Sequence, residues 1–219
     1  MTFIENEQAR CQCYKLLAGC LYQPEKDVLI EEKSLENLSR LLGFVCPAAA
    51  PFAAKMKDAL LKYSTDELLV EYAKLFVGPF ELKAAPYGSV YLDEGRKVMG
   101  ESTVKVMEIY KEEGLAMDRD FKDLPDHITV ELEFMYYLAF KEIEALEEKN
   151  TEKAGYYLDA RESFRQDFLG KWVTPFCCKI KEGTDNEFYN ALADCLAAFL
   201  AAPNGNILPD RLLNSSVRM

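Results

Sequence analysis

The sequence predicts an all-α fold, organised over residues 1–202 as a single globular domain of about nine or ten helices. Apolar residues recur every three or four positions through most of the chain, as they do on the buried face of a helix. Two pairs, Thr2 with Glu5 and Ser64 with Glu67, have the spacing of a capping box, which marks the start of a helix. We find no two alternating apolar segments joined by turn residues, the pattern that would predict paired strands.

Prolines and capping residues divide the N-terminal half into helices. The first helix begins at Thr2 and runs to Pro24, where a short helix starts. The next helices are expected over residues 34–42, 47–63 and 66–77, the last of which ends at Gly78 and Pro79.

The helical period stops between residues 78 and 101. Glycines and prolines there predict an irregular loop with a short extended run over residues 87–92. Loops longer than about 12 to 15 residues are uncommon in compact domains and are often functional. This loop is therefore the first place to look for a site.

Helices resume in the C-terminal half. A helix capped by Ser102 or Thr103 ends near Gly114, and residues 114–125 form a second loop that is a candidate hinge. Further helices are expected over residues 127–149, 151–172, 175–181 and 185–201, the last opened by a capping box of Thr184 and Glu187. Residues 203–219 are expected to form a loosely ordered tail.

The charge and hydropathy pattern excludes several classes of protein. The chain has 26 basic and 37 acidic side chains, a net charge of −11, which disfavours nucleic-acid binding because affinity for phosphates depends on Lys and Arg. A long stretch without charge, residues 41–54, contains prolines and is shorter than the roughly 20 apolar residues of a spanning helix. The N-terminus is acidic, unlike a secretory signal, so we expect a cytoplasmic location.

The seven cysteines are an odd number, which fits a reducing compartment better than a disulfide framework. The spacing of Cys11 and Cys13 and the adjacent Cys177 and Cys178 are compatible with redox or zinc chemistry, but no C-x-x-C motif is present. We favour buried thiols that act as small apolar groups.

Most catalytic motifs cannot be assembled from this chain. His127 is the only histidine, and the phosphate-binding loop, the dinucleotide-binding fingerprint and the G-x-S-x-G motif are absent from the sequence. We therefore predict a protein that is not an enzyme and that needs no metal or cofactor.

Two groups of residues in and before the long loop could bind a ligand. Tyr72, Leu75 and Phe76 lie on one helix face, a pattern that is also typical of a plain core stripe. If the run after Pro86 is extended, Tyr87, Ser89 and Tyr91 share one face and form an aromatic wall suited to a peptide. Equally, these aromatic residues could pack the loop onto the core.

A third group lies at the start of the helix near residue 127. His127 and Glu131 are four residues apart and could form a pair that raises the pKa of the histidine. With Asp126 they would suit a cationic group, although helix capping alone explains most of this segment.

These three groups carry a resemblance to the TorD/DmsD family of molybdoenzyme maturation chaperones, which is related to NarJ. Residues 72–76 match the family's aromatic-x-x-Leu-Phe signature, and residues 86–91 resemble its second block, with Gly88 where Glu is usual. Residues 125–128 with 131–135 are similar to the third block, from which Asp123 and Leu124 depart at the first two positions of Glu-Pro-x-Asp-His.

The resemblance implies a cytoplasmic, all-helical chaperone, either a monomer or a domain-swapped dimer. It would bind the twin-arginine signal peptide of a molybdopterin-containing oxidoreductase precursor, with transient association with the export machinery, and hold it until cofactor insertion is complete. The acidic surface could steer the arginines inward. The residues then expected to bind the signal peptide are Tyr72, Leu75, Phe76, Phe80, Pro86, Tyr87, Ser89, Tyr91, Asp126, His127 and Glu131.

Two alternatives stay open from the sequence. The chain could be an assembly factor that docks on the body of the molybdoenzyme rather than its leader. It could also be a carrier of a cofactor or nucleotide.

Overall fold

The computed structural model describes residues 2–78, 82–116 and 123–202, and within these ranges it contains helices and one isolated β-bridge, between Tyr87 and His127. The predicted all-α fold is confirmed. Phe80, residues 117–122 of the predicted hinge and the predicted tail lie outside the described residues. The elements are α1 (Phe3–Leu21), α2 (Lys26–Glu31), α3 (Ser34–Val45), α4 (Ala50–Leu60), α5 (Thr65–Tyr72), the π-helical turn η1 (Ala73–Val77), α6 (Ser89–Leu92), α7 (Glu101–Glu112), α8 (Ile128–Glu147), α9 (Thr151–Phe164), the π-helical turn η2 (Arg165–Leu169), α10 (Gly170–Gly183) and α11 (Glu187–Ala201).

Local hydrogen bonds start two of these helices where the sequence predicts. At α1, the backbone N–H of Glu5 donates to Thr2 Oγ1 (3.2 Å) and that of Thr2 donates to Glu5 Oε2 (2.6 Å). Ser64 and Glu67 make the same pair at α5. The third capping box is wrong, because Asn186 caps α11 by accepting from the backbone of Phe188.

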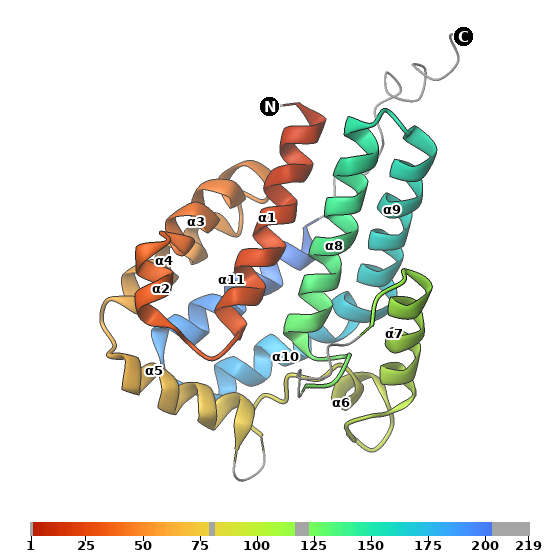
Figure 1. The fold of residues 1–219 in the computed structure, drawn as a ribbon. Coiled ribbons are helices and arrows are strands. Elements are labelled where there is room, and N and C mark those ends of the chain that lie inside the picture. Colours follow the sequence, from red (N-terminus) through yellow and green to blue (C-terminus); the bar gives the residue numbers. More distant parts are fainter. Residues whose placement is uncertain (1, 79–81, 117–122, 203–219) are drawn as a thin grey trace, which may run out of the picture.

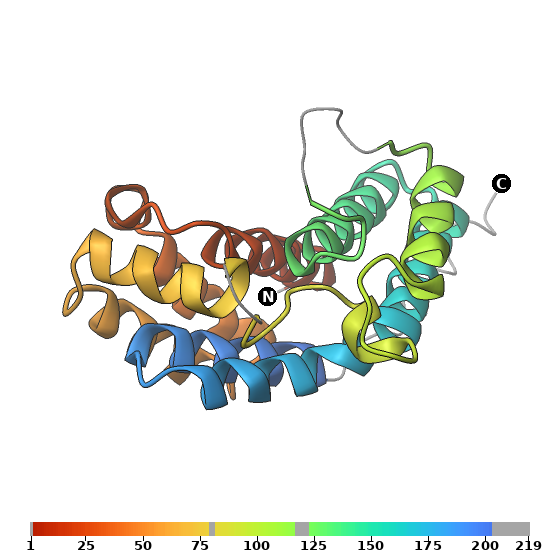
Figure 2. The same cartoon turned by 90° about the horizontal axis from the view of Figure 1, so that it is seen from below.

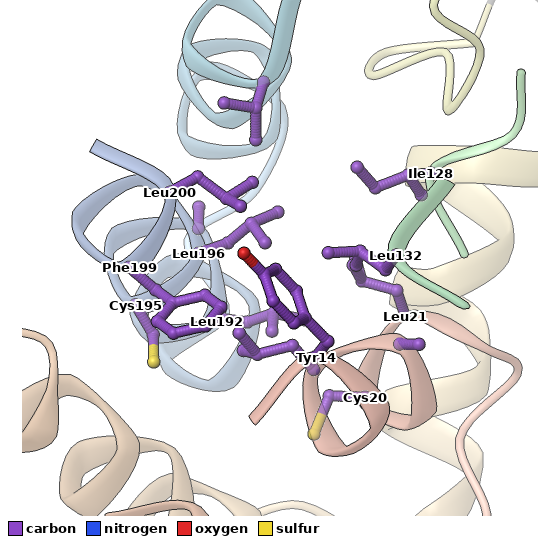
Figure 3. Close-up of a cluster of buried hydrophobic side chains, with 14 of the residues drawn as sticks. Tyr14, Cys20, Leu21, Ile128, Leu132, Leu192, Cys195, Leu196, Phe199 and Leu200 are labelled. Carbon is purple, nitrogen blue, oxygen red and sulfur yellow. The ribbon is translucent and has the colours of Figure 1, made fainter. Parts of the chain in front are cut away.

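The core lies between long helices that come together from both ends of the chain. Helices α1, α8 and α9 lie side by side, and α11 packs between α4 and α10 (Figure 1). Tyr14 of α1 is buried among leucines of α8 and α11, and its ring meets that of Phe199 edge-on at 5.0 Å (Figure 3). Aromatic pairs of this geometry stabilise a core beyond their buried area.

A π-helical turn joins α9 to α10 and changes the direction of the chain. The sequence predicts a break before Pro175, but Pro175 lies inside α10 and the change occurs at η2 instead. In Figure 1, α9 runs alongside α8, whereas α10 lies across the lower end of α8. Gly170 makes this join possible, since a Cβ there would lie 2.5 Å from the carbonyl oxygen of Arg165. A second π-helical turn, η1, ends the predicted helix 66–77 at Gly78, which has a φ of 93°.

Charged side chains are buried where α1, α8 and α9 meet. Arg161 of α9 binds Glu7 Oε2 of α1 at 2.6 Å and Glu142 Oε2 of α8 at 3.0 Å. Burial raises the pKa of Glu142 to about 7, against the opposing effect of Arg161. Because each buried charge contacts one of opposite sign, the three helices can pack together around these charged side chains.

Six of the seven cysteines are buried and Cys178 is exposed, and none forms a disulfide. Burial raises the pKa of the Cys20 thiol to about 12, as expected for an inert apolar group. Within the described ranges, no cluster of His, Cys, Asp and Glu is arranged to hold a metal ion. The described helices also include none with the length and apolar character needed to cross a bilayer.

Candidate functional site

The three motifs meet at the N-terminal end of α8. Residues 86–88 run antiparallel to residues 126–128, since the N–H of Gly88 donates to the carbonyl of Asp126 and the N–H of Ile128 donates to that of Pro86, both at 2.8 Å. In Figure 2 this segment lies between the N-terminal end of α8 and α10, near the end of α5. The tertiary structure thus joins segments that are about 40 residues apart in sequence.

A continuous series of aromatic rings connects the first two motifs through α10. Tyr91 stacks on Trp172 with ring centres 5.7 Å apart, and Trp172 contacts Phe176 at 5.5 Å. Phe176 then contacts Phe76 at 6.0 Å, and Phe76 contacts Tyr72 at 5.3 Å. Leu75 and Phe76 are buried, whereas Tyr72 and Tyr91 are only partly buried. Tyr72 and Tyr91 therefore present the accessible part of this series.

The expected extended run over residues 87–92 is wrong, because residues 89–92 form the one-turn helix α6. Ser89 is fully buried, and its backbone N–H donates to Asp126 Oδ2 at 2.7 Å. This contact from another part of the chain satisfies a helix N–H group that a local side chain normally caps. Tyr87 packs edge-on against His127 at 5.3 Å, while Tyr91 packs on Trp172, so the three side chains do not form one wall.

Two of the predicted carboxylates are internal. Asp126 is 1% exposed and Glu131 is 0% exposed, and Trp172 Nε1 donates to Glu131 Oε2 at 2.9 Å. Burial, together with the nearby charge of Asp126, raises the pKa of Glu131 well above its ordinary value despite the bond from Trp172. Asp126 Oδ1 and Glu131 Oε1 have no hydrogen-bond partner among the described residues. Asp126 therefore anchors residues 88 and 89, and Glu131 anchors Trp172.

His127 caps α8 instead of pairing with Glu131. Its Nδ1 accepts from the N–H of Thr129 at 3.2 Å and lies 2.7 Å from Thr129 Oγ1. Burial lowers the pKa of His127, although Asp123 and Asp126 oppose the shift. The expected rise in its pKa is therefore wrong, and the imidazole is neutral at pH 7.

The exposed part of the site is a carboxylate with tyrosines around it. Asp123 is exposed and accepts from the Tyr87 hydroxyl at 3.2 Å. Burial and then the charge of Asp123 raise the pKa of Tyr87 to about 12, and the same two causes raise the pKa of Tyr72. Tyr22, which follows α1, donates to Glu133 Oε1 at 2.8 Å, and Asp123 also contributes to its raised pKa after burial and the bond to Glu133. We call Tyr22, Tyr72, Tyr87, Asp123 and Glu133 the acidic tyrosine rim.

Sequence reasoning missed several of these residues. Asp123 departs from the family motif and is not among the residues expected to bind, and Glu133 lies within the third block without being a motif residue. Tyr22 and Trp172 lie far from the motifs in sequence and carry no pattern of their own. Only the packing of α1 and α10 against α8 reveals them.

Residues 46–178 match the family described as nitrate reductase delta subunit, a range that includes all three motifs and Trp172. This chain belongs to the nitrate reductase delta subunit family. The predicted membership of the TorD- and NarJ-related chaperones is thus confirmed.

Relatives of this family member carry chaperone names rather than enzyme names. It is 32% identical over 133 residues to the chaperone protein TorD of Photobacterium profundum, covering 61% of this chain and 60% of that protein. It is 26% identical over 212 residues to the chaperone protein TorD of Shewanella sp. (strain MR-4), covering 91% and 94% of the two chains. The alignment to the Photobacterium protein spans less than two thirds of that protein's length.

A solved structure shares the fold of this nitrate reductase delta subunit family member. It is described as a candidate redox enzyme maturation protein from Archaeoglobus fulgidus, and it superposes with a TM-score of 0.55 at 22% identity. The match covers 88% of this chain and 94% of that chain.

Proposed function

We propose that this protein is a maturation chaperone that binds the twin-arginine leader of a molybdopterin-containing oxidoreductase precursor. It would hold the precursor in the cytoplasm until cofactor insertion and folding are complete and export can follow. The TorD chaperone names of its relatives support the class of function. The acidic tyrosine rim is the observation that supports recognition of arginine.

The rim offers a guanidinium group what it needs. Asp123 and Glu133 are exposed carboxylates that can accept the paired N–H donors of arginine. Tyr22, Tyr72 and Tyr87 are partly exposed, and the charge of Asp123 acts on all three. A planar guanidinium can stack on the face of an aromatic ring. His127, held neutral by burial, adds no opposing positive charge. A lysine side chain is a point charge that gains less from this arrangement.

Apart from Phe80, which lies outside the described residues, the residues predicted for signal-peptide binding divide into two groups in this proposal. Tyr72, Tyr87 and Tyr91 are partly exposed and can contact the peptide directly. The other predicted residues are buried and support these tyrosines from the interior of the protein; they are Leu75, Phe76, Pro86, Ser89, Asp126, His127 and Glu131.

Calorimetric titration with synthetic leader peptides tests the proposal. We expect a peptide with the Arg-Arg pair to bind more tightly than its Lys-Lys variant, and Asp123→Asn to weaken binding of the Arg-Arg peptide severalfold. Asparagine keeps an acceptor oxygen for the Tyr87 hydroxyl, so the substitution removes mainly the charge. An exposed ion pair contributes only about 0.2–1 kcal/mol, so the arginine preference rather than total affinity is the main measurement.

The matched control is Asp159→Asn, which removes the same charge from an exposed position on α9. It should leave both affinities unchanged. Equal affinity for the two peptides would exclude arginine recognition by the rim.

The family description names a subunit of a reductase, which favours docking on the enzyme body as a second candidate. Binding of a client precursor from which the leader has been removed distinguishes the two. Undiminished binding of that truncated client would favour docking on the body.

A further inference from the structure

A groove runs between α1 and α2 beside the acidic tyrosine rim. It has a volume of about 290 Å³, and its apolar lining includes Leu16, Gly19, Val28 and Leu29. Val28 is 41% exposed, and α2 has no buried residue. The groove is thus an apolar surface that the described part of the chain leaves open to solvent.

Tyr22 connects this groove to the rim. Tyr22 lines the groove. Its hydroxyl donates to Glu133 Oε1 at 2.8 Å, and the charge of Asp123 contributes to its raised pKa. One residue therefore belongs to both surfaces. A peptide with a cationic group at Asp123 and Glu133 can therefore extend past Tyr22 into the groove.

We infer that this groove receives the apolar segment next to the paired arginines of the bound leader. The inference rests on the proposed function and specifies where a second part of the same peptide lies. The volume of the groove is just below the usual range for ligand sites, so the groove suits one or two apolar side chains rather than a whole apolar stretch. Lys15, Glu25 and Glu32 complete a polar edge around the apolar floor, as is usual in peptide and protein interfaces.

Gly19 provides a direct way to close the groove. It is exposed on α1, and a Cβ built on it meets no atom within 4 Å, so a larger side chain enters open space. Leucine is also a better helix former than glycine, so the substitution favours folding. Gly43 is a matched control, because it is an exposed glycine of α3 with the same open surroundings and does not line the groove.

The experiment compares two synthetic peptides by calorimetry. Both contain Arg-Arg, followed in one by a leucine-rich segment and in the other by serines. The unmodified protein should bind the leucine peptide at least roughly tenfold more tightly, about 1.4 kcal/mol. Gly19→Leu should remove this preference and keep the preference for Arg-Arg over Lys-Lys, whereas Gly43→Leu should change neither.

A second variant tests the groove independently, in case Gly19→Leu changes the folding of the protein. Val28→Ser removes an apolar wall at an exposed position and should also reduce the leucine preference. Circular-dichroism melts confirm that each variant is folded.

The outcomes separate this inference from the proposed function. If the protein prefers Arg-Arg but binds the leucine and serine peptides equally, or if both groove variants keep the leucine preference, the groove is not the apolar subsite. If neither peptide binds, the proposed function fails and the inference fails with it.

Discussion

Gly88 lies against the buried bond between Trp172 and Glu131, and its replacement by alanine tests that packing. The backbone of Gly88 has φ −58° and ψ −40°, which alanine adopts without strain. At such a position glycine to alanine commonly stabilises a protein by about 0.4–1 kcal/mol, because the unfolded chain loses freedom. Considered locally, the substitution should therefore be favourable.

The tertiary structure predicts the opposite sign. A Cβ on Gly88 would lie 2.9 Å from Trp172 Nε1 and 3.3 Å from Glu131 Oε1, so the indole must move away from its acceptor. Leaving a buried polar group without its bond costs about 1–3 kcal/mol. Against the local gain, we expect Gly88→Ala to lower the free energy of unfolding by about 1–2 kcal/mol.

Urea unfolding measures the change in the free energy of unfolding caused by Gly88→Ala, and tryptophan fluorescence shows whether the indole has moved. Trp172 is the only tryptophan, so tryptophan emission reports on the surroundings of this one side chain, and we expect a shift in the variant. The control is Gly43→Ala, an exposed helical glycine with open space, which should gain about 0.5–1 kcal/mol. A Gly88→Ala protein as stable as Gly43→Ala, with unchanged emission, would refute the reasoning.

Three further substitutions test buried groups and the π-helical join. Glu142 has a pKa of about 7 in the folded protein against an ordinary 4.5, so the folded state binds more protons in this range. Acidification from pH 7 to pH 5 should therefore raise stability by about 2 kcal/mol, and Glu142→Gln should remove this gain in urea unfolding. The pKa of His127 is lowered, so its contribution has the opposite sign and stability is lost as pH falls below 6.5. His127→Asn keeps a capping side chain and should abolish that loss, measured by the same method. Gly170→Ala places a Cβ 2.5 Å from the Arg165 carbonyl and should lower the melting temperature by roughly 2–4 °C for each kcal/mol lost.

A specific result would contradict each of these three predictions. A pH dependence that Glu142→Gln leaves intact would show that another group binds the proton. A fall in stability below pH 6.5 that persists in His127→Asn would remove the histidine as its cause. A melting temperature for Gly170→Ala at or above that of the unmodified protein would mean that the π-helical join does not depend on glycine.

Helix starts were predictable where the responsible atoms are close in sequence. Thr2 with Glu5 and Ser64 with Glu67 cap their helices as expected, since both partners lie within one turn. The prediction failed at residues 89–92, because the N–H of Ser89 is satisfied by Asp126 from another part of the chain. No local pattern records such a partner.

The candidate site shows the same division. The family resemblance assigned Tyr72, Tyr87 and Tyr91 to one site, and in the structure a series of aromatic rings joins Tyr72 to Tyr91. Spacing also suggested a pair between His127 and Glu131, but Trp172 binds Glu131 and Thr129 binds the histidine. Four residues on a helix can meet, but competing partners decide whether they do.

The sequence by itself determined the helical class, most helix boundaries and the family, because periodicity, capping and motif order are properties of neighbouring residues. Only the tertiary structure decided which acids are exposed. It buries Asp126 and Glu131 beneath residues 86–91 and leaves Asp123 and Glu133 at the surface with Tyr22. The physical reason is that burial depends on which distant segments pack over a side chain, and here residues 86–91 and α10 cover Asp126 and Glu131 at the N-terminal end of α8.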